Sequence, residues 1–187
     1  MIRIRKATPA DATEIAPIML SAMEDIIYYF IGKNDKKEAL DFLTRHIRRP
    51  SNQYSYEYIF VAEADGQLVG QICLYPGADL QRLRHPVLLD LASTYDRTLK
   101  LPAETQSGEV YIDTIAVSPG YQGRGIGKML LLYAVDLFVK RNQQVLGLLV
   151  NLDNPLAKKL YLNIGFTIVN RVHIFGAEME HLQYSIG

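Results

Sequence analysis

Apolar and polar residues in the first half of the chain follow two different periods, which predict a strand, two helices and two further strands. Strict alternation over Ile2 to Lys6 predicts a short strand. Thr8 can cap the helix that follows it, and Pro50 ends the second helix. Asp65-Gly66, between two apolar runs, is the strongest hairpin signal in the chain. The predicted elements are a strand at 2–6, a helix that opens at Thr8, a helix at 35–49 and strands at 58–63 and 67–74.

The second half of the chain has a more regular pattern, in which strands and helices alternate. Residues 145–150 are almost continuously apolar, as expected of a strand that is buried on both faces. Asn154, Pro155 and Gly165 occupy the cap, the first turn and the end of one predicted helix. The predicted elements are a strand at 110–117, a helix at 124–141, a strand at 145–150, a helix at 154–165 and strands at 166–174 and 181–186. This order indicates an α/β or α+β fold, with one sheet and helices on its faces.

Residues 76–108 interrupt the pattern. A helix is predicted near 87–99, and Pro86, Pro102 and Gly108 punctuate the rest. The connection is far longer than the usual loop of about 2–6 residues, and its many leucines make it too apolar for a free tail. Because no linker or repeat is visible, we predict a single domain over 1–187 with an atypical insertion at about 76–108.

Composition and charge exclude several classes of protein. The chain carries 20 Lys+Arg and 20 Asp+Glu, so its net charge gives no reason to expect a nucleic-acid partner. A single cysteine, Cys73, excludes an internal disulfide and a cysteine-based zinc site, and the histidines lack metal-ligand spacing. Neither a signal peptide nor an apolar run of ~20 residues is visible. We therefore expect a cytoplasmic protein with no metal, no nucleic acid and no membrane among its partners.

A glycine-rich segment, Gln122 to Lys128, lies between the strand predicted at 110–117 and the helix that follows it. Small residues there let backbone N–H groups approach an anion, and the helix dipole adds positive charge. The pattern predicts a phosphate or pyrophosphate site, although a turn that only packs the strand against the helix would look the same. Gln122 and Met129 exclude a P-loop, and Lys128 in place of a third glycine excludes the dinucleotide fingerprint.

Two motifs of the second half resemble those of the GNAT superfamily of acyl-coenzyme A-dependent N-acetyltransferases. Gln122-x-x-Gly125-x-Gly127 matches the signature Q/R-x-x-G-x-G/A of that family. Residues 154–161, Asn-Pro-Leu-Ala-Lys-Lys-Leu-Tyr, followed by Gly165-Phe166, resemble its second motif. The resemblance is dense from 110 to 166, extends more loosely across 1–71, and has no counterpart for 76–108.

The resemblance implies a mixed central sheet, splayed between the strands at 110–117 and 145–150, with helices on both faces and coenzyme A in the cleft. Backbone of the first strand would pair with the pantetheine arm, and backbone of the glycine-rich segment would hold the pyrophosphate. Asn154 would reach the pantetheine, while Lys158 would contact the nucleotide phosphates or stay solvated. The cofactor-binding residues implied in this way are Ile115, Ala116, Val117, Gln122, Gly123, Arg124, Gly125, Ile126, Gly127, Lys128, Asn154 and Lys158.

Acetyl transfer requires the acceptor amine to lose a proton and the departing thiolate to gain one. The resemblance places Tyr161 near the thioester sulfur, where its phenol could act as the acid; an aromatic packed on the sheet is the alternative. As the base, Glu109 and Asp113 are candidates, since they share strand parity and face one side unless a bulge intervenes. Either carboxylate could instead be a solvated strand end or a hydrogen-bonded strand residue. Leu149 stands where some relatives have a glutamate base, so the chain departs from the family there.

The sequence therefore predicts an acyltransferase, an N-acetyltransferase that uses acetyl-coenzyme A as co-substrate. Its acceptor would be a primary amine of a small molecule or of a peptide or protein. Residues 76–108 are expected to cover the acceptor side of the cleft, unless they only cover the sheet or make a dimer contact; homodimers are common in the resembled family. The alternatives are a non-catalytic coenzyme A-binding sensor or interaction domain and an acyltransferase for a longer acyl group.

Overall fold

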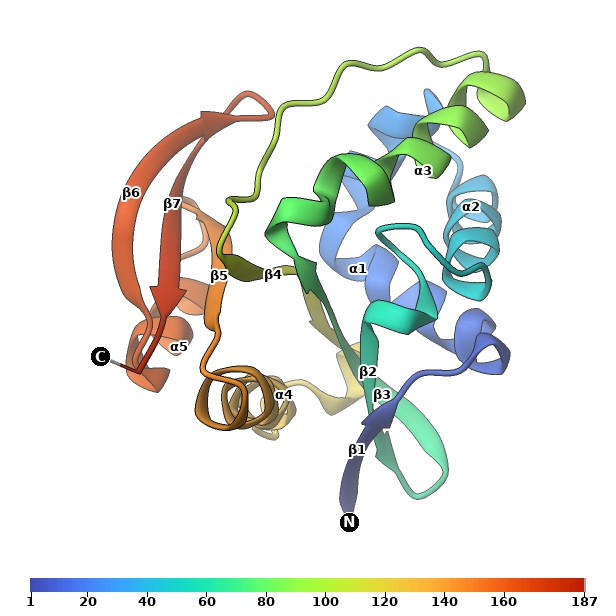
Figure 1. Ribbon diagram of the computed structural model, residues 1–187. Helices are drawn as coiled ribbons and strands as arrows, with labels where there is room; N and C mark the ends of the chain where they lie inside the picture. The colour runs from blue at the N-terminus through green and yellow to red at the C-terminus, as the bar shows by residue number, and fades with distance from the viewer. Residues whose placement is uncertain (187) are drawn as a thin grey trace.

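The strands of the computed structural model, which describes residues 1–186, form one mixed sheet in the order β1-β2-β3-β4-β5-β7-β6 (Figure 1). Neighbouring strands are antiparallel except β4 and β5, which are parallel. The strands are β1 (Ile2–Lys6), β2 (Ile59–Ala64), β3 (Gln67–Pro76), β4 (Glu109–Val117), β5 (Val145–Asn151), β6 (Thr167–Ile174) and β7 (Ala177–Tyr184). The α-helices are α1 (Ala12–Ile31), α2 (Lys36–Arg48), α3 (Leu80–Tyr95), α4 (Ile126–Ala134) and α5 (Pro155–Ile164).

Helices cover both faces of the sheet and close two hydrophobic cores. On one face, α1, α2 and α3 bury residues such as Phe42 and Leu91 against β2 and β3. On the other face, α4 and α5 bury Leu130 and Tyr161 against the strands. The predicted mixed sheet with helices on both faces is therefore confirmed.

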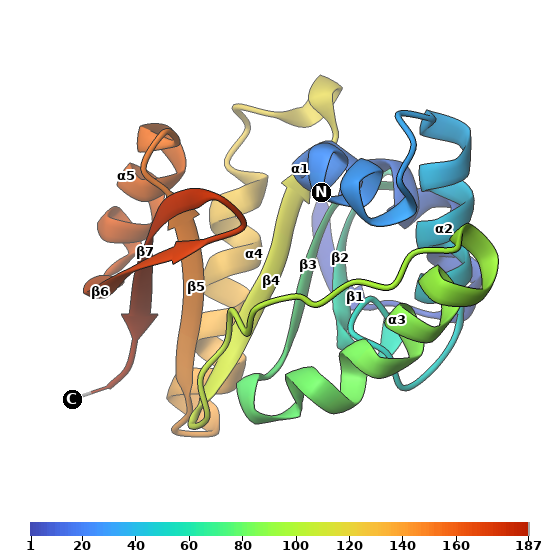
Figure 2. The same ribbon diagram turned by 90° about the horizontal axis from the view of Figure 1, so that it is seen from above.

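β4 and β5 pair at one end and then separate. Hydrogen-bonded register joins Glu109–Tyr111 to Val145–Gly147, although β4 continues to Val117 and β5 to Asn151. Figure 2 shows the two strands diverging from this point. The splay that the resemblance implied is thus present, and it leaves one edge of each strand without a neighbouring strand.

A β-bulge lies in β4 at Asp113. In the register with β3, Ile112 pairs with Leu74 and Thr114 with Cys73, so Asp113 is the extra residue. A bulge of this kind re-aims side chains and changes the alternation of faces. The parity argument for Glu109 and Asp113 consequently stops at the bulge, and the two carboxylates have different surroundings.

Element boundaries differ from the prediction in three places. The helix predicted at 124–141 is α-helical only over Ile126–Ala134 and continues as a π-helix over Val135–Arg141. α3 spans Leu80–Tyr95, earlier than the helix expected near 87–99, because a 3₁₀ turn at Gly77–Asp79 starts it and Asp96, at φ +53°, ends it. The last strand starts at Ala177 because Phe175 and Gly176 both adopt positive φ and form a tight turn. Phenylalanine is unusual in that conformation, so the sequence did not signal the turn.

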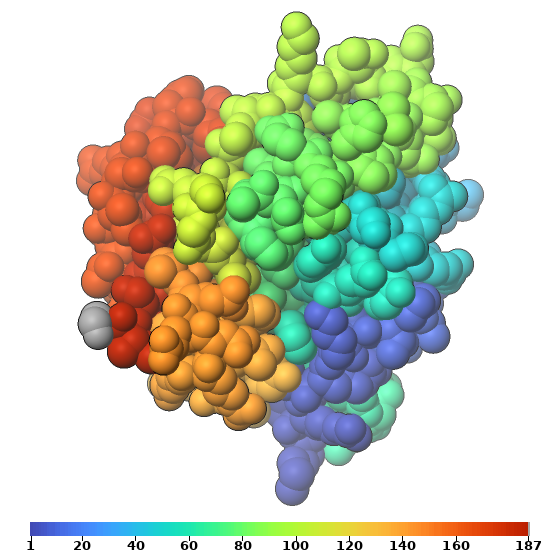
Figure 3. Space-filling view, viewed as in Figure 1, coloured from blue at the N-terminus to red at the C-terminus, as the bar shows by residue number. Residues whose placement is uncertain are grey.

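The residues between α3 and β4, 96–108, form an extended strap. It runs across the molecule from the end of α3 toward β4 and β5 (Figure 2). In the space-filling view, this strap fills the space between α3 and the β6–β7 hairpin (Figure 3). Strap and α3 together make up most of the insertion predicted at about 76–108.

Within residues 1–186, no single helix is long and apolar enough to cross a membrane. Only when Pro9–Ile31 and Lys36–Arg48 are taken together do they meet that length and composition, and the two helices are bent by 98° relative to each other.

A buried polar cluster holds the paired end of β4 and β5 to β7. Glu109 accepts hydrogen bonds from His181 Nε2 and Gln183 Nε2, both at 2.8 Å, and from the Gln106 N–H at 3.1 Å. Burial raises the pKa of the Glu109 carboxyl, but these hydrogen bonds outweigh it and hold that pKa below 4.5. The cluster requires glycine at position 147, because a Cβ atom on Gly147 would overlap the Glu109 carboxylate.

Replacing Glu109 by Gln should lower the free energy of unfolding by about 1–3 kcal/mol near pH 7, because a charged acceptor of buried hydrogen bonds is lost. A carboxyl group with a depressed pKa contributes stability above its unfolded pKa and loses it as the pH falls through the folded value. The difference between the parent and Glu109→Gln should therefore shrink below pH 4.5. Urea unfolding at several pH values measures both effects.

The exposed pair of His173 and Glu178, 2.7 Å apart, supplies the control. Glu178→Gln removes the same kind of contact at a site that is exposed to solvent, and it should change the free energy of unfolding by less than about 1 kcal/mol. Equal effects of the two substitutions would mean that the Glu109 cluster does not hold the strands together.

Candidate functional site

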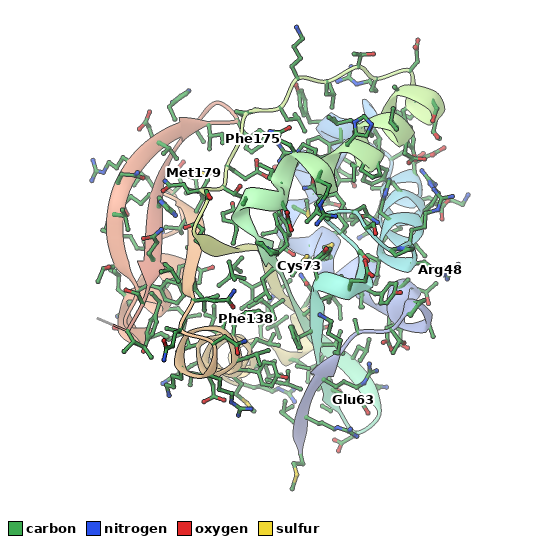
Figure 4. All side chains as sticks on the ribbon, viewed as in Figure 1. Arg48, Glu63, Cys73, Phe138, Phe175 and Met179 are labelled. Carbon is green, nitrogen blue, oxygen red and sulfur yellow. The ribbon has the colours of Figure 1, made fainter. Side chains whose placement is uncertain are left out.

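A cavity of about 830 Å³ opens where β4 and β5 diverge. Its walls come from α1, from β4 and β5, from the glycine-rich turn before α4, from α5 and from the strap. The β6–β7 hairpin adds Phe175 and Met179, which lie at the same side of the molecule in Figure 4. One cavity thus joins most of the segments that the sequence singled out.

The glycine-rich turn has the backbone geometry of an anion site. Gly123 and Gly125 have φ of +76° and +78°, and a Cβ at either position would meet no atom within 4 Å. Within residues 1–186, the N–H groups of Gly123, Arg124 and Gly125 donate to no backbone carbonyl. The first N–H groups of α4 are also free, as at every helix start. The turn has small residues, open space around them and several N–H donors, so it fits a pyrophosphate.

The other cofactor-binding predictions fall into two groups. Ile115, Ala116, Val117, Gln122, Gly123, Gly127 and Asn154 line the cavity, whereas Arg124, Gly125, Ile126, Lys128 and Lys158 do not. Asn154 Oδ1 accepts from the Ala157 N–H at 3.1 Å, which caps α5 and leaves its amide N–H groups to donate. Gln122 Nε2 donates to the Val117 carbonyl at 3.1 Å.

The side chains of the expected cations point to other partners. Lys158 Nζ lies 2.5 Å from Glu180 Oε2, so the α5 lysine is held by β7. Arg124 donates to the Gly120 carbonyl at 2.9 Å, and its guanidinium lies 4.8 Å from the centre of the Tyr121 ring. Lys128 is exposed on α4. The donors that remain open around the turn are therefore mainly backbone N–H groups.

Tyr161 combines the two environments that the sequence left open, since it packs in the core and also faces the cavity. Its ring packs 6.0 Å from that of Phe166 and is 8% exposed, as a core aromatic would be. The same residue also lines the cavity. Burial raises the pKa of the phenol, which keeps it protonated and able to donate. Packing fixes the ring and leaves the proton available.

Asp113 lies in the same cavity, next to a buried tyrosine. Tyr75 donates its hydroxyl to Asp113 Oδ1 at 2.8 Å. Burial and the charge of Glu104 raise the pKa of the Asp113 carboxyl from 3.8 to about 7, against opposing effects of Tyr75 and Arg84. A carboxylate that titrates near neutral pH suits a general base.

Glu109, the second candidate base, lies outside the cavity. The buried cluster described above uses both carboxylate oxygens, and its pKa is depressed rather than raised. The structure therefore places its carboxylate at the closed end of the strand pair, outside the cavity lining. Leu149 does line the cavity, at the position where a glutamate would act in some relatives.

Several cavity residues carried no signal in the sequence. Arg84 and Glu104 form a buried ion pair in the wall, and Gln53 and Tyr54 lie beside it. α1 is broken at Met23, with φ −145°, and the residues around the break line the cavity. Sequence spacing alone cannot assign these residues to a cavity, because Glu104 lies in an irregular segment and no proline marks the break at Met23.

The remaining chemically active side chains are placed elsewhere. Cys73 is fully buried in the core, as a small apolar residue would be. His46 is buried against Asp90 at 3.0 Å, and burial lowers the pKa of its imidazole to about 4. Residues 1–186 contain no group of three or more His, Cys, Asp or Glu placed to hold a metal ion.

Comparison with solved structures identifies full-length neighbours. A crystal structure described as that of an acetyltransferase is 30% identical, with a TM-score of 0.84, covering 99% of this chain and 100% of its own. An N-acetyltransferase from Staphylococcus aureus Mu50 is 25% identical, with a TM-score of 0.86 over 97% and 100% of the two chains. A PaiA N-acetyltransferase from Thermoplasma acidophilum, in complex with coenzyme A, shares the fold at 17% identity and a TM-score of 0.58, over 98% and 99% of the chains.

Curated relatives match shorter stretches. Mycothiol acetyltransferase of Renibacterium salmoninarum is 39% identical over 66 residues, which are 35% of this chain and 19% of that protein. A ribosomal protein bS18 alanine N-acetyltransferase of Salmonella typhimurium is 38% identical over 80 residues, 42% of this chain and 54% of that protein. The chain thus spans about a fifth to a half of the length of these relatives.

A family model settles the classification. The model of the acetyltransferase (GNAT) family matches residues 28–166, a range that contains the splayed strands, the glycine-rich turn and α5. The expected acyltransferase class is confirmed at this level. The chain belongs to the acetyltransferase (GNAT) family.

Proposed function

We propose that this protein transfers an acetyl group from acetyl-coenzyme A directly to a primary amine of a small molecule or a peptide. One observation carries the proposal: a single cavity joins the free edge of β4 and the glycine-rich turn to Asp113 and Tyr161. A donor site for phosphates, a carboxylate that titrates near pH 7 and a protonated phenol therefore face the same space. These are the parts that amine acetylation needs.

The residues present fit acetyl-coenzyme A, which would supply an activated acetyl thioester. Backbone of Ile115–Val117 lies on the edge of β4 that β5 has left, so its N–H and C=O groups can pair with the pantetheine arm. The N–H groups around Gly123 and Gly125 are open to a pyrophosphate. Asn154 offers its amide N–H groups to the same arm.

Asp113 is the base in this proposal. An alkyl ammonium with a pKa near 10.4 is neutral in only about 4 of 10,000 molecules at pH 7, so it needs a proton acceptor. A carboxylate with a pKa of about 7 attracts the ammonium and then accepts its proton. Tyr75 holds one Asp113 oxygen through its hydroxyl, and in this proposal the other oxygen accepts the proton.

Tyr161 is the acid. The ammonium first gives one proton to Asp113. The neutral amine then forms the N–C bond as the C–S bond breaks, the Tyr161 hydroxyl gives its proton to the sulfur, and the second proton of the nitrogen passes to solvent. Because burial raises the pKa of the phenol, it holds this proton at neutral pH. The proton that Asp113 gains and the one that Tyr161 loses are later exchanged with solvent.

The experiment is a thiol-release assay with acetyl-coenzyme A and a panel of amines. We expect amine-dependent release of coenzyme A, with acetylated product confirmed by mass spectrometry. Binding of coenzyme A without turnover of any amine would instead favour a sensor or interaction domain. Faster release from propionyl- or butyryl-coenzyme A would favour an acyltransferase for a longer chain.

Replacing Tyr161 by Phe should slow the chemical step by about 10²–10⁴, because only the proton donor is removed. Coenzyme A affinity and melting temperature should barely change, since the ring still packs on Phe166. Pre-steady-state kinetics measure the step directly. Tyr133→Phe, on α4 and outside the cavity, is the matched control. A parent-like rate in Tyr161→Phe would make the phenol purely structural.

Asp113→Asn should abolish the rise of kcat/KM that the parent shows as the pH increases through about 7. The same substitution should stabilise the protein. A carboxyl whose folded pKa is above its unfolded 3.8 costs stability progressively as the pH rises from 3.8 to about 7. Above pH 7, Asp113→Asn should be more stable than the parent by about 1–3 kcal/mol. An unchanged pH profile would remove Asp113 from the base role.

Gly125→Val should weaken coenzyme A binding at least tenfold, about 1.4 kcal/mol, because a branched side chain enters the turn that must approach phosphate oxygens. Calorimetry measures the affinity. The same substitution at Gly66, whose φ of +81° is similar and whose hairpin lies away from the cavity, controls for backbone strain. Equal affinities for all three proteins would contradict the phosphate site.

A further inference from the structure

The insertion supplies two charged residues to the cavity wall. Arg84 comes from α3 and Glu104 from the strap, and their side chains are 2% and 7% exposed. Their printed hydrogen bonds join them to each other, to Gln53 and to Pro102, and they line the cavity together with Tyr54 and Asp113, the base of the proposed function. The insertion therefore builds part of the wall that the acceptor meets.

Arg84 is held in place by the protein itself. Its guanidinium donates to Glu104 Oε1, to the Pro102 carbonyl at 2.9 Å and to Gln53 Oε1 at 3.2 Å. These contacts tie α3, the strap and the segment before β2 together. An arginine satisfied in this way is a fixed part of the wall rather than a free anion site.

Glu104 is only half satisfied. Its Oε1 receives the Arg84 bond, whereas its Oε2 is buried and has no hydrogen-bond partner within residues 1–186. A buried carboxylate oxygen without a donor is costly, and an ionised carboxylate can only accept. Since Glu104 lines the cavity, a donor carried by the bound acceptor is the group that can meet this oxygen.

The charge around the cavity favours a positively charged donor. The charged residues of its wall are Arg84, Glu104 and Asp113, of which two are acidic. At Asp113, the charge of Glu104 acts more strongly than the opposite charge of Arg84. An anionic group would therefore be repelled where a cationic group is attracted, and a charge-assisted hydrogen bond to a carboxylate is stronger than a neutral one.

We propose that Glu104 binds a second ammonium group of the acceptor, so that the preferred acceptors are aliphatic diamines. One amine reacts beside Asp113 and Tyr161, and the other donates to Glu104 Oε2. This inference rests on the proposed acetyl transfer and adds the substrate class to it. It assigns Glu104 as a specificity-determining residue.

The test compares four acceptors of one chain length: cadaverine, aminopentanol, pentylamine and aminopentanoate. The shorter and longer diamines, putrescine and diaminohexane, cover other spacings. For the parent, kcat/KM for the best diamine should exceed that for pentylamine at least tenfold, and aminopentanoate should be the poorest. Equal rates with the diamine and the amino alcohol, or a preference for the amino acid, would overturn the assignment.

Glu104→Gln keeps the shape and removes the charge. It should lower the ratio of kcat/KM for the diamine to kcat/KM for pentylamine at least tenfold; both amines share any change at Asp113, so the ratio reports the second ammonium alone. It should also raise aminopentanoate relative to the diamine, because Arg84 becomes unpaired. The double variant Arg84→Gln/Glu104→Gln removes both charges and should show the same fall in the ratio of diamine to pentylamine. It keeps the test decisive if the single variant does not fold.

Glu63→Gln is the matched control, since it breaks another glutamate–arginine pair, with Arg5 at 2.9 Å, on β2 and away from the cavity. Figure 4 shows Glu63 at the end of the molecule near β1. The ranking of the acceptors by kcat/KM should be the same for Glu63→Gln as for the parent.

Calorimetry of the same amines with the coenzyme A-loaded protein separates the two proposals. Cadaverine binding that falls in Glu104→Gln, without turnover of any amine, would sink the transferase function and keep the Glu104 site. Turnover of amines with no dependence on Glu104 would keep the function and refute the site. Equal affinity of cadaverine for the parent and for Glu104→Gln would refute the Glu104 site, whether or not any amine is acetylated.

Discussion

The separation of two parallel strands is the constraint on which the site depends. β4 and β5 share hydrogen bonds over Glu109–Tyr111 and Val145–Gly147 and then part, although both continue. Such a separation leaves backbone donors and acceptors unpaired, which is unfavourable unless another group meets them. The buried contacts of Glu109 with β7 and the absence of a side chain at Gly147 hold the closed end, so that the open end can be maintained.

At the open end, the groups available to the proposed coenzyme A are mostly backbone groups. The free edge of β4, the donors of the glycine-rich turn and the start of α4 are all backbone. The lysine and arginine side chains expected nearby are engaged elsewhere or exposed. Side-chain chemistry is concentrated instead at two points of the cavity, Asp113 and Tyr161, each fixed by an aromatic neighbour.

The sequence predicted the fold well, and it singled out the glycine-rich turn and α5, because both depend on local patterns. Apolar periodicity marks the strands and helices, and positive-φ glycines with a capping Asn154 mark the turn and α5. The acceptor side could not be predicted in the same way. The choice between Glu109 and Asp113 depended on a bulge in the pairing of β4 with β3, which involves residues far apart in the chain. Arg84 and Glu104 meet only after the strap has crossed the sheet.

The two walls of the cavity come from separate stretches of the chain. In the proposed function, the acceptor meets residues before 105, in α1, around Tyr54, in α3 and in the strap, whereas coenzyme A meets residues after 112. Asp113 lies at the boundary between them. On the proposed function, substitutions in the N-terminal half would change the choice of acceptor while the coenzyme A half stays intact. Such a division would give the chain a route to new acceptors that keeps the same acyl donor at every intermediate stage.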